Sequence, residues 1–295
     1  MNRIFRTITL CTSQTGANMA RVWGPRGLRV WLALAAMAGM LGAAAPRGAS
    51  AAEGALQRYW YVVCPGIRDD LSFGGAGIVV FDIDHGYRFV KRIATWASQA
   101  DKPDNIKGVC ASAATGRLYF TTRSELFCVE LASDKTLWRQ ALPDGTDRMS
   151  ITPDGKWLYV PSFEKETWNV VDGATGALVK SLETHSGAHN TVVSRDGQRM
   201  YLGGLRSPLL FVASTETHEL VQEVGPFSAA IRPFTVNGRR TRAYVCVNDL
   251  LGFEIGDLTH GTKLHRVVVQ GYATGPVKRH GCPSHGIGLT PDERE

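Results

Sequence analysis

The sequence predicts an all-β protein, a β-propeller of four-stranded antiparallel blades, and two observations support this prediction. In residues 147–179, four short β-branched and aromatic runs are separated by Pro-Asp-Gly and Asp-Gly turns, which is the pattern of a single antiparallel sheet. The unit also recurs: Tyr159 has counterparts at Tyr119, Tyr201 and Tyr244, with spacings of 40, 42 and 43 residues. Four strands in about 40–45 residues is the period of a propeller blade.

The same pattern, followed along the chain, predicts the strands of each blade. They are expected at 59–64, 78–82 and 87–93 in the first blade, at 108–111, 117–121, 126–130 and 136–139 in the second, at 148–151, 157–160, 168–171 and 178–182 in the third, at 190–193, 199–202, 209–213 and 219–224 in the fourth, at 234–236, 242–247, 252–255 and 266–269 in the fifth, and at 286–289 in the sixth. The first blade has no inner strand before Tyr59 in the mature chain, residues 52–295, and the sixth has one strand only. We therefore expect seven intended blades, of which about five are present, and a chain that is incomplete at its C-terminus, in blade six.

Residues 1–51 differ in kind from the rest. They contain six Arg, no Lys and no acidic residue, followed by an apolar run at 30–45 and by Ala49-Ser50-Ala51. This is the composition of a secretory signal peptide that is cleaved after Ala51. The alternative, a membrane anchor, fits less well because the run is shorter than the ~20 residues of a span. We expect residues 52–295 to form the propeller domain, periplasmic or secreted, with no stable membrane span after cleavage.

Charge and cysteine usage narrow the functional classes. The six Arg of the leader account for the whole formal charge of +6. Residues 52–295 are therefore formally neutral and lack the excess of basic residues that is typical of nucleic-acid-binding proteins. Five cysteines follow the leader without metal-finger spacing. Four lie in predicted strands, where a buried apolar thiol is the ordinary interpretation. Cys282, in a predicted loop, is the candidate for pairing or reaction, and the odd number leaves at least one thiol unpaired or intermolecular.

The first position of each inner strand holds the candidate functional residues. It lies twelve residues before each motif Tyr, and an alignment of Asp292 with Asp154 adds a fifth position. All five positions are ionisable although the flanking strands are apolar. They are expected to surround the mouth of the central channel, with Arg148 and Asn190 one step further in, on the face where binding loops gather. The predicted channel-mouth residues are Lys107, Asp147, Arg148, His189, Asn190, Arg232 and His285.

Two interpretations of these residues remain open. One is a ligand or metal site that uses His189 and His285, with His185 and Asp147 as further candidates, because imidazole and carboxylate suit a divalent transition metal. The other is a wet channel mouth that tolerates polar side chains. The sequence contains no G-x-S-x-G elbow, P-loop or dinucleotide fingerprint. A divalent metal is thus the one cofactor suggested, and no catalytic residue is assigned.

The motifs TPDGKWLYV at 152–160, WNVVDGATGALVKSL at 168–182 and SRDGQRMYLGG at 194–204 resemble those of bacterial YVTN-type β-propeller repeat proteins. The resemblance covers residues 58–295. It implies a WD40-like superfamily that includes cell-surface binding proteins, lactonase-like propellers, and the propeller parts of quinoprotein amine dehydrogenases and haem d1 nitrite reductases. No C-x-x-C-H motif is present, which disfavours the redox relatives.

The favoured function is an exported binding or scaffold protein that recognises a protein or small-molecule ligand on its channel-mouth face. The alternative is a metal-assisted, lactonase-like hydrolase or lyase at the same place. Whether the protein is an enzyme stays open, with a non-enzymatic role favoured.

Overall fold

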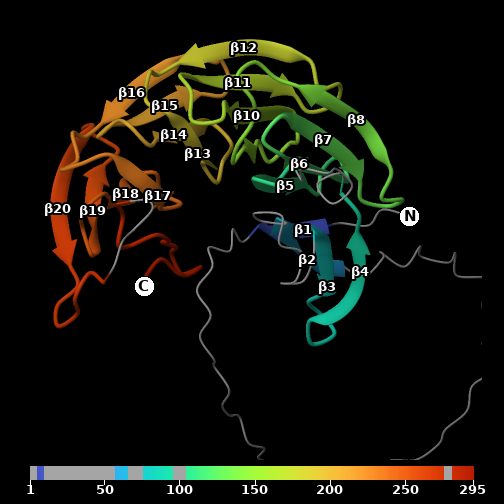
Figure 1. Cartoon of the computed structure of the whole chain (residues 1–295), viewed down its shortest axis with the longest axis horizontal. Coiled ribbons are helices and arrows are strands. Elements are labelled where there is room, and N and C mark those ends of the chain that lie inside the picture. Colours follow the sequence, from blue (N-terminus) through green and yellow to red (C-terminus); the bar gives the residue numbers. More distant parts are fainter. Residues whose placement is uncertain (1–4, 10–56, 66–75, 96–103, 276–280) are drawn as a thin grey trace, which may run out of the picture.

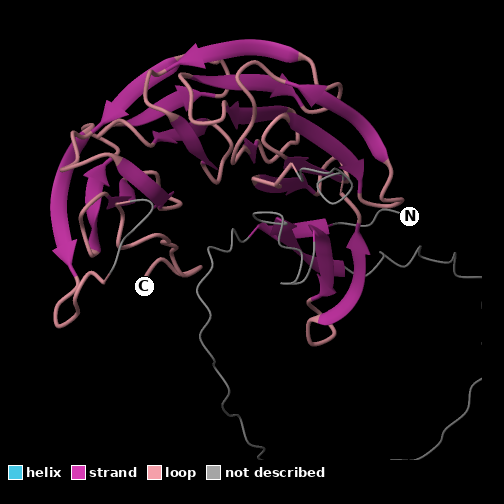
Figure 2. Cartoon of the chain, viewed as in Figure 1, coloured by secondary structure: helices cyan, strands magenta, loops and turns pink. Residues whose placement is uncertain are grey.

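The computed structural model describes residues 5–9, 57–65, 76–95, 104–275 and 281–295. Five four-stranded sheets stand side by side in an arc around a common axis (Figure 1). The described residues form strands and connecting loops without helices (Figure 2). Each sheet is one consecutive segment of the chain, apart from the first strand of the first sheet. The all-β propeller architecture predicted from the repeats is confirmed.

The strands of each blade follow one another from the centre of the arc to its outside. Blade one has β1 (Phe5–Thr9), β2 (Gln57–Pro65), β3 (Ala76–Asp82) and β4 (Arg88–Ile93), and blade two has β5 (Gly108–Ser112), β6 (Arg117–Thr121), β7 (Glu125–Glu130) and β8 (Thr136–Ala141). Blade three has β9 (Ser150–Ile151), β10 (Trp157–Pro161), β11 (Thr167–Asp172) and β12 (Leu178–Glu183). Blade four has β13 (Ala188–Val193), β14 (Arg199–Gly204), β15 (Leu210–Ser214) and β16 (Leu220–Val224), and blade five has β17 (Ile231–Val236), β18 (Arg242–Val247), β19 (Gly252–Asp257) and β20 (Thr262–Val268).

The middle strands of a blade are buried and the outer strands are exposed. In blade two, the central residues of β6 and β7 are buried, whereas no residue of β8 is buried. A middle strand is covered on both faces because a neighbouring blade packs on each side. Its sequence is therefore a continuous apolar run, as in the Leu118–Phe120 segment, and does not alternate between apolar and polar residues.

The hydrophobic core is divided among the interfaces between successive blades. Four clusters of buried side chains are present in the described part of the chain, and each joins one blade to the next. The cluster between blades two and three, for example, packs Leu126 and Cys128 against Leu158 and Val160. Apolar burial at these interfaces is the main favourable term that holds the arc together.

The repeated Tyr is a link between blades. The hydroxyl of Tyr119 in blade two donates to the carbonyl oxygen of Gly173 in blade three at 2.8 Å. The hydroxyl of Tyr159 in blade three lies 3.2 Å from the carbonyl oxygen of Ser214 in blade four. In both cases the acceptor lies in or beside the turn between the third and fourth strands of the next blade. The period of the motif therefore reflects a repeated contact between blades.

The turn after the inner strand has the same hydroxyl-to-carboxylate contact in blades three and four and in residues 290–295. Thr152 Oγ1 donates to Asp154 Oδ1 at 2.5 Å, and Thr290 Oγ1 donates to Asp292 Oδ1 at 2.6 Å. The same contact, made by a Ser in blade four, joins Ser194 to Asp196. Residues 290–295 thus repeat the first turn of a blade, as the alignment of Asp292 with Asp154 predicted. The strand predicted at 286–289 is wrong, because no described strand pairs with that segment.

Blade one departs from the other four. Its inner position is occupied by β1, which pairs with β2 in parallel, with Phe5 opposite Gln57. β1 lies within the predicted leader, so the expectation that no inner strand precedes Tyr59 after residue 51 stays a prediction. The rest of the leader lies outside the described residues, and its cleavage after Ala51 stays a prediction. Nowhere in the described chain is there a helix that is long and apolar enough to cross a bilayer.

Cys282, predicted to be the cysteine available for pairing or reaction, is buried. Its thiol donates to the carbonyl oxygen of Ser284 at 2.9 Å. Burial raises the pKa of the Cys282 thiol to about 11. Because the thiolate is the reactive form, this environment disfavours nucleophilic chemistry at neutral pH.

Candidate binding site at the channel mouth

Asp147 is the buried centre of the candidate site. It lies three residues before β9, the inner strand of blade three, and none of its side chain is exposed. Its backbone N–H donates to the carbonyl oxygen of Pro161 at 3.0 Å, and its carbonyl oxygen accepts from Thr121 Oγ1 at 2.8 Å. Gly108 permits this approach, because a Cβ there would lie 2.9 Å from Arg148 Cα. The backbone of Asp147 is thus held by blade two as well as by its own blade.

The Asp147 carboxylate connects residues of two blades. Its Oδ2 lies 2.6 Å from His189 Nδ1, and its Oδ1 lies 3.3 Å from Arg148 NH1. The same guanidinium nitrogen lies 2.6 Å from His189 Nε2. Because a guanidinium can only donate, Nε2 accepts and Nδ1 carries the proton given to Asp147. The three side chains form a closed hydrogen-bonded triangle, which we call the mouth triad: Asp147, Arg148 and His189.

The mouth triad spans the junction of two inner strands. Arg148 and Asn190 form an isolated parallel bridge, which brings the start of blade three beside the start of blade four. Side-chain exposure rises from none at Asp147 to 13% at His189 and 33% at Arg148. The carboxylate is therefore hidden and the guanidinium faces the channel. The structure brings Asp147, Arg148, His189 and Asn190 together, and their role in ligand binding stays a prediction.

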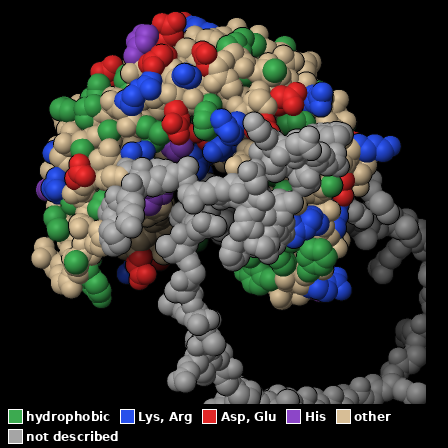
Figure 3. Space-filling view, viewed as in Figure 1, with side chains coloured by type: hydrophobic (Ala, Val, Ile, Leu, Met, Phe, Trp, Pro, Cys, Tyr) green, Lys and Arg blue, Asp and Glu red, His purple; other side chains and the backbone are tan. Residues whose placement is uncertain are grey.

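Lys107 and His285 lie in the electrostatic field of this triad, and Arg232 acts on His285. Burial lowers the pKa of the Lys107 ammonium, against the attraction of Asp147. Burial also lowers the pKa of the Arg232 guanidinium, whose Nε donates to Asn248 Oδ1 at 2.7 Å. At His285, burial again lowers the pKa of the imidazole, and the charges of Arg148 and Arg232 add to this effect. Basic and His side chains are visible on the inner edge of the arc, with acidic ones among them (Figure 3).

The predicted metal ligands do not form a ready coordination site. Both ring nitrogens of His189 have protein partners in the mouth triad. His185 has a side chain that is 73% exposed and lies near Glu166 and Glu183, away from the triad. Within the described residues, no group of three or more His, Cys, Asp or Glu side chains is arranged to hold a metal ion. Metal binding by His189 and His285 stays a prediction that requires Arg148 to move.

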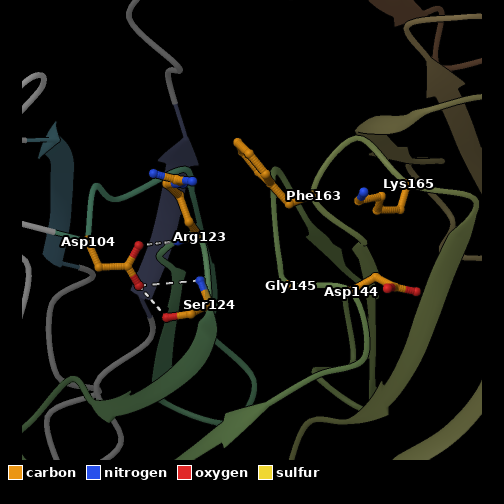
Figure 4. A pocket seen from close by; sticks show the side chains of 7 residues that line it. All are labelled: Asp104, Arg123, Ser124, Asp144, Gly145, Phe163 and Lys165. Carbon is orange, nitrogen blue, oxygen red and sulfur yellow. Dashed lines mark hydrogen bonds between the residues drawn. The ribbon is translucent and has the colours of Figure 1, made fainter.

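A pocket on the same face lies beside the channel mouth, and none of its lining residues was among those predicted. It is lined by Asp104, Arg123, Ser124, Asp144, Gly145, Phe163 and Lys165 (Figure 4). A signal for part of it exists in the repeat, since Arg123 and Phe163 each follow a motif Tyr by four residues. That offset places them in the loop between the second and third strands, on the face of the channel mouth.

The repeated blades and their face-side loops place this chain among the β-propeller proteins. No family model matches the sequence, and no curated protein matches it. Among solved structures, the chain is similar to the hydrazine synthase of Kuenenia stuttgartiensis, with a TM-score of 0.51 and 17% identity over 58% of this chain and 50% of that one.

The chain is also similar to the dihydro-heme d1 dehydrogenase NirN in complex with DHE. The TM-score is 0.57, with 14% identity over 72% of this chain and 44% of that chain. The chain thus spans half the length, or less, of these two solved structures. At such low identities both similarities are similarities of fold, and they support the propeller architecture alone.

Proposed function

We propose that this protein is an exported, YVTN-type propeller that acts as a binding module and takes a small anionic ligand at its channel mouth. The observation that carries this proposal is the mouth triad, in which a fully buried carboxylate holds a partly exposed guanidinium in one place. An Arg fixed in this way is pre-organised to donate two hydrogen bonds to a carboxylate or phosphate.

The charge balance around the triad supports an anion. Asp147 compensates Arg148, while Lys107 and Arg232 share the attraction of one further acid, Glu164, so that one positive charge remains at the mouth. Their lowered pKa values express the cost of holding cations in a partly buried place. A bound anion would remove that cost, and a concave cationic site also concentrates anions from solution. A periplasmic or secreted location remains part of the proposal.

Replacement of Arg148 tests the proposal. Citrate, inorganic phosphate and acetate are titrated into the protein by calorimetry, and we expect citrate to bind more tightly than acetate. Arg148→Gln is expected to weaken citrate binding roughly tenfold or more, because a hydrogen bond to a charged group is worth about 1.5–3 kcal/mol. Arg139→Gln, on the exposed outer strand of blade two, is the matched control and is expected to bind citrate like the wild type. Equal losses in both variants, or no binding of any of the three anions, would contradict the proposal.

The hydrolase or lyase alternative draws its support from the Asp147–His189 hydrogen bond at 2.6 Å. A carboxylate that orients an imidazole is a common arrangement for a general base. For this role Nε2 must be released from Arg148. The test compares wild type with the His189→Ala, His285→Ala double variant after incubation with Zn²⁺ or Mn²⁺. We expect no stoichiometric metal by mass spectrometry and no lactone hydrolysis in either protein. Metal and activity that are both lost in the double variant would establish the enzyme instead.

A further inference from the structure

The pocket between blades two and three is a separate recess from the channel mouth. It has a volume of about 440 Å³, within the range of sites for small organic ligands. None of its lining residues belongs to the mouth triad. Asp104, Arg123 and Ser124 form one side, and Asp144, Gly145, Phe163 and Lys165 form the other (Figure 4). The pocket therefore lies across the junction of two rigid blades.

The loops that form the pocket are held by many backbone contacts. Gly145 has a φ of +78°, and a Cβ there would lie 2.5 Å from the carbonyl oxygen of Arg123. Only glycine permits this combination of conformation and close approach. The next residue, Thr146, donates its N–H to that same carbonyl oxygen at 3.0 Å, and Phe163 N–H donates to the carbonyl oxygen of Asp144 at 2.9 Å. The shape of the pocket is thus set before any ligand binds.

Two cations of the pocket have no acidic partner in the described chain. Neither the Arg123 guanidinium nor the Lys165 ammonium lies within ion-pairing distance of a described carboxylate. The Asp104 carboxylate accepts from the backbone N–H groups of Arg123 and Ser124, at 2.9 and 3.3 Å, and from the Ser124 hydroxyl. The carboxylate of Asp144 points away from Arg123 (Figure 4). The lining residues are formally neutral as a set, but the two cations are not engaged in ion pairs with described residues and are available to a ligand.

Phe163 supplies an apolar surface between these cations. The Arg123 guanidinium carbon lies 5.2 Å from the centre of the Phe163 ring, and Lys107 Nζ lies 4.9 Å from it. Figure 4 shows the ring standing between the Arg123 and Lys165 side chains. A flat ligand ring that enters here meets an aromatic ring and a guanidinium plane, both of which favour aromatic partners. The acidic end of such a ligand meets a guanidinium or an ammonium.

We propose that this pocket binds a small aromatic carboxylate, with its ring against Phe163 and its carboxylate on Arg123, while Lys165 adds positive charge on the other side of the Phe163 ring. The site is additional to the anion site proposed at the channel mouth. Its lining side chains are not those of the mouth triad, and Lys107 lies between the two sites, over the Phe163 ring. Charge selects for the carboxylate, and the shape and chemistry of Phe163 and Arg123 select for the ring. An aliphatic acid satisfies the first requirement only, and a neutral aromatic amide satisfies the second only.

The test uses benzoate as the probe, with benzamide and acetate as partners that lack the charge or the ring. Binding is measured by calorimetry on the whole chain. Benzoate is expected to bind at least tenfold more tightly than benzamide or acetate. Arg123→Gln is expected to weaken benzoate binding roughly tenfold, since charge-assisted hydrogen bonds are among the stronger ones. Lys165→Gln is expected to act in the same direction. Phe163→Leu keeps the site apolar, removes the aromatic ring and is expected to narrow the preference for benzoate over acetate.

One control separates this site from general surface charge. Lys135→Gln, in the exposed turn after β7, is expected to leave benzoate binding unchanged. Equal binding of benzoate and benzamide, or an undiminished preference in Phe163→Leu, would overturn the proposal. So would the absence of saturable benzoate binding at millimolar concentrations. A loss in Arg148→Gln without one in Arg123→Gln would place the anion at the mouth, and the proposed function would then survive while this inference fails.

Discussion

Asp147→Ala is expected to lower the free energy of unfolding by about 2–3 kcal/mol, although the substitution lies at the edge of a channel. Removal of one partner of a buried charge pair costs about 3–5 kcal/mol when both partners are deeply buried. Here the Arg148 side chain is 33% exposed, so water can solvate the guanidinium after the carboxylate is removed, and we expect a smaller cost. His189 loses the acceptor for Nδ1 in the same substitution. Urea denaturation followed by tryptophan fluorescence measures the change.

The control for this experiment is a carboxylate that lies on the surface. Glu183→Ala removes a side chain that is 69% exposed at the end of β12, and we expect its effect to stay within about 0.5 kcal/mol. Asp147→Asn is expected to fall between the two, because it keeps the shape and one acceptor but loses the charge. If Asp147→Ala were as mild as Glu183→Ala, the triad would not be the rigid support on which the proposed anion site depends.

Trp168→Ala is expected to have the largest effect on stability, a loss of about 3–5 kcal/mol, as for other buried aromatic side chains. Trp168 is fully buried in the cluster between blades three and four. Its indole N–H donates to Thr191 Oγ1 at 2.9 Å, across that interface. The substitution therefore leaves a cavity and removes a polar link between blades. Calorimetry of thermal unfolding, read together with urea denaturation, measures the loss.

Trp138→Ala is the matched comparison. Trp138 lies on the outer strand of blade two, only partly buried, with its indole N–H on the carbonyl oxygen of Ala174. We expect a loss of roughly 1–2 kcal/mol there, because less apolar surface leaves the protein. Since blades contact only their neighbours, Trp168→Ala is also expected to broaden the transition, as stacks of repeats lose cooperativity when one interface is weakened. A cost for Trp168→Ala no larger than for Trp138→Ala would contradict the interblade core described above.

The blades could be predicted because each one repeats the same local chemistry. Asp154 and Asp196 close their turns through the same hydroxyl-to-carboxylate contact, so a short motif marks the end of each inner strand. Tyr119 and Tyr159 contact the next blade in the same way, so their spacing measures one blade. Counting twelve residues back from each motif Tyr gives the start of each inner strand. This count predicted that Asp147 and His189 occupy equivalent positions in neighbouring blades.

Two features lie outside what the repeat could predict. β1 pairs in parallel with β2 from a point about fifty residues upstream in the sequence, outside the period of the blades. Residues 286–289 have the composition of an inner strand, yet a strand also needs a hydrogen-bonded neighbour, and no described strand pairs with them. Composition reports the preference of a segment, whereas pairing depends on what lies beside it.

The sequence by itself determined the architecture of this protein and the face on which function is to be sought, because both depend on periodic residues and on turn chemistry that acts locally. The tertiary structure alone decided what the face contains. That Arg148 joins His189 across two blades, and that Arg123 and Lys165 flank Phe163 without acidic partners in the described chain, depends on side-chain direction and on the angle between neighbouring blades. Side-chain direction and the angle between blades arise from packing between segments about 40 residues apart, so they cannot be predicted from the local sequence.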